Sequence, residues 1–117
     1  MQHEVKKITL IINELLTMFL LNGGQEIDMK VKRIDGETEI VLEHHNCTYD
    51  EAFIERLEHN LNTMRQFEVE GYYWQLVGED ESADELYLVG AMVDEADVSC
   101  ENGELKIRLL RKENSKG

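Results

Sequence analysis

Proline is absent from this 117-residue chain, and cysteine occurs only twice. Without proline, turns depend on Gly, Asn and Asp, so these residues indicate where the secondary structure changes. Cys47 and Cys100 are too few for a disulfide framework, and we therefore expect a reducing, cytoplasmic compartment. The longest apolar run, Met18 to Leu21, is far too short to cross a bilayer, and the N-terminus lacks an export-signal pattern.

Basic residues are also scarce. The chain carries 12 Lys and Arg against 25 Asp and Glu, a net charge of −13. This charge repels phosphate backbones and anionic lipids, so we expect neither a nucleic-acid nor a membrane partner. Hydrophobic residues make up 42% of the chain, which is enough for one core. We expect a single domain over residues 1–111 and a polar tail over residues 112–117.

Helical periodicity appears in several segments. Apolar residues at helical spacing predict a helix at about residues 3–22, which Gly23-Gly24 would end with a left-handed cap. A capping-box pattern at Thr48–Glu51 predicts a second helix that is capped by Thr48 and ends near Arg65.

The next two segments carry weaker signals. Residues 85–96 have helical spacing and predict a helix. Residues 68–78 fit either a helix or a strand, and we favour a short helix.

Period-two alternation predicts two hairpins. Asp35-Gly36 would join strands near residues 27–31 and 38–43, and Asn102-Gly103 would join strands that begin at Val98 and Leu105. The order of elements predicts an α+β two-layer sandwich, in which an antiparallel or mixed sheet of at least four strands carries three to four helices on one face. In the last strand, the alternation assigns three basic residues to the solvent side: Lys106, Arg108 and Arg111.

Two short sequences resemble GHKL ATPases, the superfamily of histidine kinases, anti-sigma-factor kinases and gyrase-type topoisomerases. Asn13-Glu14-Leu15-Leu16-Thr17 resembles the start of the helix that carries the N-box, and Leu86-Tyr87-Leu88-Val89 resembles the helix after the second glycine box. The resemblance implies a Bergerat-type fold in a bacterial protein, with ATP and Mg²⁺ bound between the first helix and the Glu43–Thr48 loop. Glu14 matches a position where some members carry their general base.

The nucleotide-binding positions depart from the family pattern. Met18 stands where the family has the asparagine that holds Mg²⁺, and a thioether is a poor ligand for this hard cation. The Glu43–Cys47 stretch lacks the glycines of the family's Asp-x-Gly-x-Gly element. The lid position, Ala83–Leu86, has two acidic residues in place of Gly-x-Gly, whose backbone amides would cradle phosphate.

We therefore expect a pseudo-ATPase with no cofactor and no catalytic residue, which acts as a regulatory or protein-interaction module with a protein partner or as a homodimer. The alternative is an ATP/Mg-dependent protein kinase of the anti-sigma type with divergent motifs, in which Glu14 would be the base. If Glu14 is buried it needs a partner, whereas an exposed position beside Asn13 would need none.

Two other groups of residues are candidates. His44, His45 and Cys47 could offer imidazole and thiolate ligands to zinc, but adjacent histidines point different ways, and we favour a surface loop. Aromatic residues often anchor protein interfaces, although Trp74 could instead fill the core. The candidate interaction residues are Tyr72, Tyr73 and Trp74.

Overall fold

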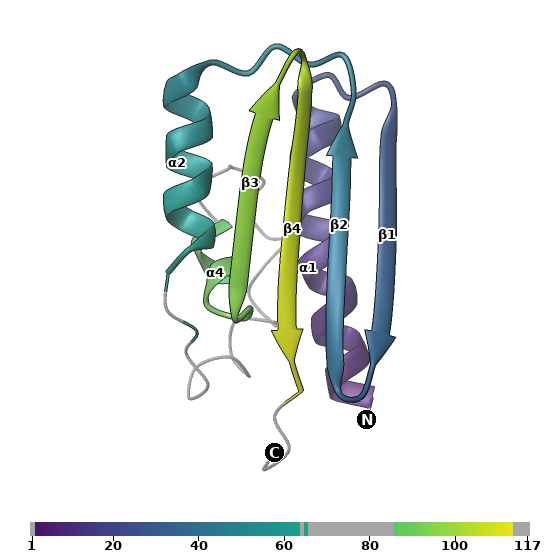
Figure 1. Ribbon diagram of the computed structural model, residues 1–117. Coiled ribbons are helices and arrows are strands. Elements are labelled where there is room, and N and C mark those ends of the chain that lie inside the picture. The colour runs from purple at the N-terminus through teal and green to yellow at the C-terminus, as the bar shows by residue number, and fades with distance from the viewer. Residues whose placement is uncertain (1, 64, 66–85, 114–117) are drawn as a thin grey trace.

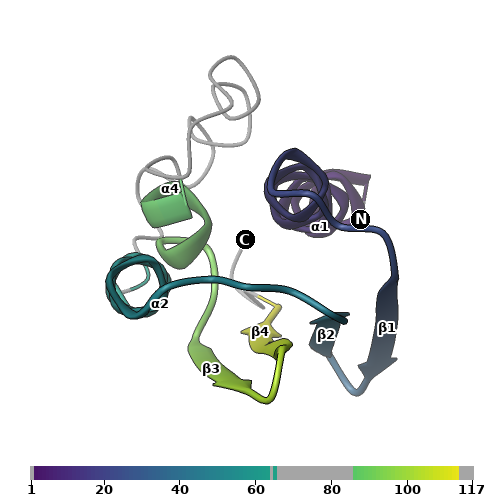
Figure 2. The same ribbon diagram turned by 90° about the horizontal axis from the view of Figure 1, so that it is seen from above.

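The computed structural model describes residues 2–63, 65 and 86–113. The four strands in these residues form one antiparallel sheet in the order β1-β2-β4-β3, and the helices lie on one face of it (Figures 1 and 2). The elements are α1 (Gln2–Leu21), β1 (Ile27–Ile34), β2 (Glu37–His44), α2 (Glu51–Leu61), α4 (Leu86–Gly90), β3 (Glu95–Glu101) and β4 (Glu104–Lys112).

The predicted α+β fold with a sheet of at least four strands is confirmed, and of the two predicted sheet types, antiparallel or mixed, the structure has the antiparallel one. The described residues contain two long helices, α1 and α2, and the five-residue helix α4. The predicted total of three to four helices stays a prediction, because the segment at residues 68–78 lies outside the described residues. Within the described residues, no helix is both long and apolar enough to span a membrane.

The core lies between the helices and the central strands. Alternate residues of β2 and β4 face the helices, because side chains alternate between the two sides of a strand. Full burial of one large aliphatic side chain contributes about 1.5–3 kcal/mol. The fully buried members from α1, β2 and β4 include Ile11, Leu15, Phe19, Ile40, Leu42, Leu105, Ile107 and Leu109.

Local turn chemistry behaves as predicted. Asp35 and Gly36 have φ values of 53° and 77°, and Asn102 and Gly103 have values of 53° and 78°. These positive angles at both central positions are those of the favoured two-residue hairpin turn. Gly23 has φ of 83°, and the Gly24 amide donates to the Phe19 carbonyl at 2.9 Å, which closes α1 as expected.

The predicted bounds of α2 are wrong at both ends. The N-cap is Asp50 and not Thr48, because Asp50 Oδ1 accepts from the Phe53 amide at 2.8 Å. The helix ends at Leu61, since the Asn62 side chain donates to the Glu58 carbonyl at 2.9 Å and satisfies a group of the last turn.

The predicted helix over residues 85–96 is also wrong beyond its first turn. Helix α4 ends at Gly90, and β3 begins at Glu95 and pairs with β4 from there on. The helical spacing of residues 95–96 does not produce a helix, because the backbone groups of residues 95–101 form hydrogen bonds in the β3–β4 ladder.

Arg111 lies on the core face of β4 and not on the predicted solvent side. Its side chain is 1% exposed and its Nε and Nη2 each donate to the Glu4 carboxylate of α1 at 2.8 Å. Nη1 donates to the Met92 carbonyl at 2.7 Å. The prediction failed because Arg111 comes two residues after Leu109 and therefore lies on the same side of the strand. Its burial is possible because an acidic partner, Glu4, lies 107 residues earlier in the chain.

Candidate functional site

Aromatic side chains occupy the space between α1 and the loop that follows β2. The ring of Phe19 in α1 lies 5.2 Å from that of His44, and His44 lies 5.3 Å from Tyr49, centroid to centroid. Tyr49 in turn stacks on Phe53 of α2 at 4.8 Å. This row of four rings, which we call the aromatic row, stands where the GHKL resemblance would place a nucleotide.

His44 and Tyr49 form a neutral hydrogen-bonded pair within the aromatic row. His44 Nδ1 and the Tyr49 hydroxyl are 2.8 Å apart, and His44 is 1% exposed. Burial lowers the pKa of His44 below its ordinary 6.5, with a smaller contribution from the positive charge of His45. Burial also raises the pKa of Tyr49 far above 10. Both groups are therefore uncharged at neutral pH, as a packed structural pair requires.

Met18 and Glu14, the two α1 residues that align with functional positions in the GHKL resemblance, face inward. Met18 is 4% exposed and belongs to the hydrophobic core. Glu14 is 8% exposed, whereas its neighbour Asn13 is exposed, so the two do not share an exposed flank. The glutamate at the family's base position is thus a core-facing residue of a helix packed on the sheet.

The predicted zinc candidates separate into different environments. His44 points into the core, whereas His45 is at the end of the sheet and contacts Asp28 and Glu104. The Cys47 thiol donates to the Gly103 carbonyl at 3.3 Å and to the His44 carbonyl at 3.5 Å. Burial raises the pKa of the Cys47 thiol, and this disfavours the thiolate that a nucleophile or a zinc ligand needs.

His45 directly follows β2 and links it to β1 and β4 at one end of the sheet. Its Nε2 is 2.8 Å from Asp28 Oδ2 of β1, and its Nδ1 contacts Glu104 Oε1 of β4. The two carboxylates raise the pKa of His45 to about 9, Asp28 contributing most and Glu104 next. The imidazole is therefore protonated at neutral pH. It also lines an open hollow of about 470 Å³ with Gly23, Gln25, Glu26 and Asn46.

The same end of the sheet offers a set of possible metal ligands. Asp28, Glu43 and His45 each have a ligand atom within 4.8 Å of the others, and they share only His45 with the predicted zinc set. Imidazole and carboxylate suit zinc or manganese. A metal would have to displace the proton that His45 shares with Asp28, because histidine binds metals in its neutral form. We interpret the cluster as an ion-paired histidine.

We expect the free energy of unfolding to fall as the pH rises from 6.5 to 9. The folded protein holds the His45 proton to a pKa of about 9, against 6.5 for an ordinary histidine, so this stabilisation is fully present below pH 6.5 and is lost as the pH passes 9. Urea denaturation at half-unit pH steps measures the slope. The His45→Gln variant should lose the slope, whereas His59→Gln, at an exposed site on α2, should keep it. An unchanged slope in His45→Gln would contradict this assignment.

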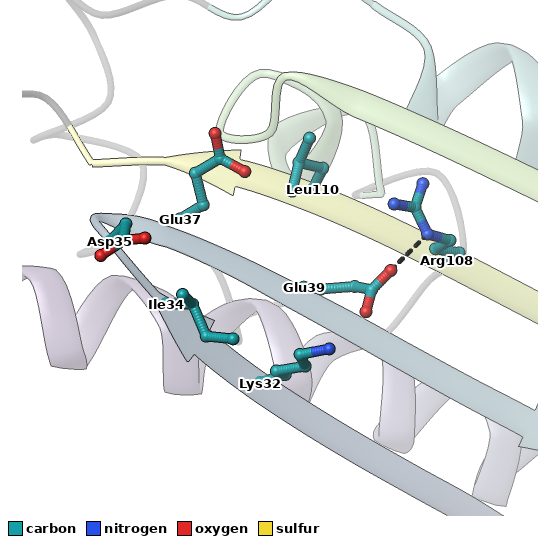
Figure 3. A pocket seen from close by; sticks show the side chains of 7 residues that line it. All are labelled: Lys32, Ile34, Asp35, Glu37, Glu39, Arg108 and Leu110. Atoms are coloured by element: carbon teal, nitrogen blue, oxygen red, sulfur yellow. Dashed lines mark hydrogen bonds and ion pairs between the residues drawn. The ribbon is translucent and has the colours of Figure 1, made fainter.

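A second hollow lies on the helix-free face of the sheet (Figure 3). It measures about 330 Å³. Arg108 Nε donates to Glu39 Oε2 at 2.5 Å, and Arg108 Nη1 is 3.3 Å from Asp97 Oδ2. The hydrogen bond from Arg108 lowers the pKa of Glu39. The guanidinium in this hollow is thus already matched by two carboxylates. The hollow is lined by Lys32, Ile34, Asp35, Glu37, Glu39, Arg108 and Leu110.

Asp28 and Glu104 could not be recognised from the sequence as partners of His45. They lie 17 and 59 residues away from it in the chain. Hairpin register brings Asp28 near the end of β2, but only the pairing of β2 with β4 brings Glu104 there. The remaining candidates, Tyr72, Tyr73 and Trp74, lie outside the described residues, as does the lid position up to residue 85.

No family model matches the sequence, and a search of curated proteins finds no significant match.

Proposed function

We propose that this chain is a non-catalytic domain of GHKL type that acts as a regulatory or protein-interaction module. The N-box-like sequence of α1, the hairpin that follows it and the closing β3–β4 hairpin support the family assignment. The main observation against nucleotide binding is the aromatic row. An adenine ring cannot occupy space that Phe19, His44 and Tyr49 already fill.

The metal side of the chemistry is disfavoured as well. Mg²⁺ takes oxygen ligands in near-octahedral geometry. The side chain at the family's metal-holding position, Met18, is apolar and packed in the core. A base at Glu14 would have neither a metal nor a bound phosphate to act with.

An interaction role is supported by apolar side chains on the surface. Among the described residues, six large apolar side chains are at least 41% exposed, and three of them belong to β1, a strand at the edge of the sheet. Met29 and Val31 share the helix-bearing face of this strand, and neighbouring exposed apolar residues favour a binding surface over a purely solvated one. The six are Val5, Leu20, Leu21, Met29, Val31 and Ile34.

We expect no saturable heat when Mg-ATP is titrated into the protein at millimolar concentration in a calorimeter, and no rise in thermal stability. A nucleotide present at a hundred times its Kd would raise the free energy of unfolding by about 2.7 kcal/mol, which a thermal scan detects. Mg-ADP and Mg²⁺ alone serve as controls. Saturable ATP binding would overturn the pseudo-ATPase proposal and favour the divergent kinase, in which Glu14→Gln should then abolish phosphoryl transfer.

A further inference from the structure

We propose that the exposed edge of β1 pairs with the same edge of a second copy of this chain, in an antiparallel register centred on Met29. This inference rests on the proposed interaction role and names its partner. It is carried by three properties of β1: its unpaired side, its exposed apolar residues and the order of its charges.

The first property is the open edge. In the part of the chain that the structure describes, β1 is the outermost strand of the sheet and pairs with β2 alone (Figure 2). The His45 amide donates to the Glu26 carbonyl at 3.0 Å, so the even-numbered residues of this strand turn their backbone groups toward β2. The odd-numbered residues turn theirs outward. An edge of this kind is a template for another strand.

The second property is incomplete cover on the helix-bearing face. Met29 and Val31 pair with Leu42 and Ile40, so all four side chains point to the side of the sheet that carries the helices. The β2 partners are fully buried, whereas Met29 is 49% and Val31 is 41% exposed. The sheet is therefore apolar up to its last strand, and a further strand would cover this margin.

The third property is the order of charges. Lysines on an edge strand normally oppose pairing with another strand. In a two-fold register centred on Met29, however, Asp28 faces Lys30 of the partner subunit, and Glu26 faces Lys32 of the partner subunit. Each of these pairs occurs twice. On the other face, Met29 meets Met29 of the partner subunit, and Ile27 meets Val31 of the partner subunit.

Neighbouring registers lack this match. A two-fold axis at Lys30 sets that lysine against itself, and an axis at Val31 sets Lys30 against Lys32 of the partner subunit. An axis at Asp28 sets two aspartates together. Like charges directly opposite each other destabilise a strand pair. The Met29 register avoids all of these contacts, and it joins the outward backbone groups of the odd-numbered residues in hydrogen-bonded pairs.

Disulfide trapping tests the register. In a Cys100→Ser background, the Met29→Cys variant should form a covalent dimer with oxidised glutathione, because hydrogen-bonded antiparallel pairs have Cα atoms about 5.5 Å apart, within disulfide range. Val31→Cys is the matched control: in this register it stands about 14 Å from its own copy and should not cross-link. Cross-linking of Lys30→Cys or Val31→Cys in place of Met29→Cys would overturn the register.

Charge reversal tests the dimer itself. We choose Glu26 and Lys32, because Asp28 is already bound to His45. The Lys32→Glu variant should weaken dimerisation about tenfold by sedimentation velocity, and Glu26→Lys with Lys32→Glu should return it to within about threefold of wild type. A wild-type protein that stays monomeric at high concentration overturns this inference. That outcome is separate from ATP binding, which would overturn the pseudo-ATPase proposal instead.

Discussion

Replacing Glu4 with alanine is expected to lower the free energy of unfolding by about 3–5 kcal/mol. Glu4 accepts two hydrogen bonds from Arg111, and the two residues are 7% and 1% exposed. The substitution leaves the Arg111 guanidinium buried without this carboxylate. Breaking a buried ion pair lowers the free energy of unfolding far more than breaking a surface pair does. Urea denaturation followed by circular dichroism measures the loss.

Two further variants distinguish this explanation from a general effect of the substitution. Glu55→Ala, at an exposed position on α2, should change stability by no more than about 0.5 kcal/mol. A double variant, Glu4→Met with Arg111→Met, should recover most of the loss, since well-packed apolar residues often replace a buried ion pair at little cost. A double variant as unstable as Glu4→Ala would show that the charge pair is not the cause.

The Gly90→Ala variant is expected to lose about 3 kcal/mol or more, at the upper end of the cost of overpacking. An added Cβ would lie 2.2 Å from the Asn60 carbonyl oxygen and 2.7 Å from Thr63 Oγ1, so α4 would have to move away from the end of α2. In an open helix the same change would stabilise by about 1 kcal/mol. The sign of the effect is therefore decided by the contact between the helices.

Gly23→Ala is the matched glycine control. Its φ is +83° and no atom lies within 4 Å of an added Cβ, so the cost is backbone strain of about 1–2 kcal/mol. We expect Gly90→Ala to lower the urea midpoint more than Gly23→Ala does. The reverse order would contradict the close packing of α4 on α2.

Local chemistry made several features of this protein predictable. Asp35-Gly36 and Asn102-Gly103 adopt positive φ at both positions, which few other pairs tolerate, and so both hairpins could be placed. Gly23 ends α1 for the same reason. The place of Met18 in the core also follows from its apolar identity and its helical spacing.

The candidate site was less predictable, because its contacts join distant parts of the chain. His45 was identified only as a candidate zinc ligand in a surface loop, whereas its two carboxylate partners come from β1 and β4. His44 was assigned to a surface loop, yet it packs between Phe19 of α1 and Tyr49 in the aromatic row. The burial of this part of the chain depends on packing against α1 and α2, and the sequence of the loop alone does not reveal those contacts.

The sequence by itself determined the α+β class, the two hairpins and the end of the first helix, because these depend on periodicity and on backbone angles within a few residues. Tertiary structure decided that Arg111 faces the core, that α4 stops at Gly90 and gives way to the β3–β4 pairing, and that His45 is held by two carboxylates. Each of these depends on a partner that is distant in the chain, and whether a charge is buried or a helix continues is decided by the free energy of that contact.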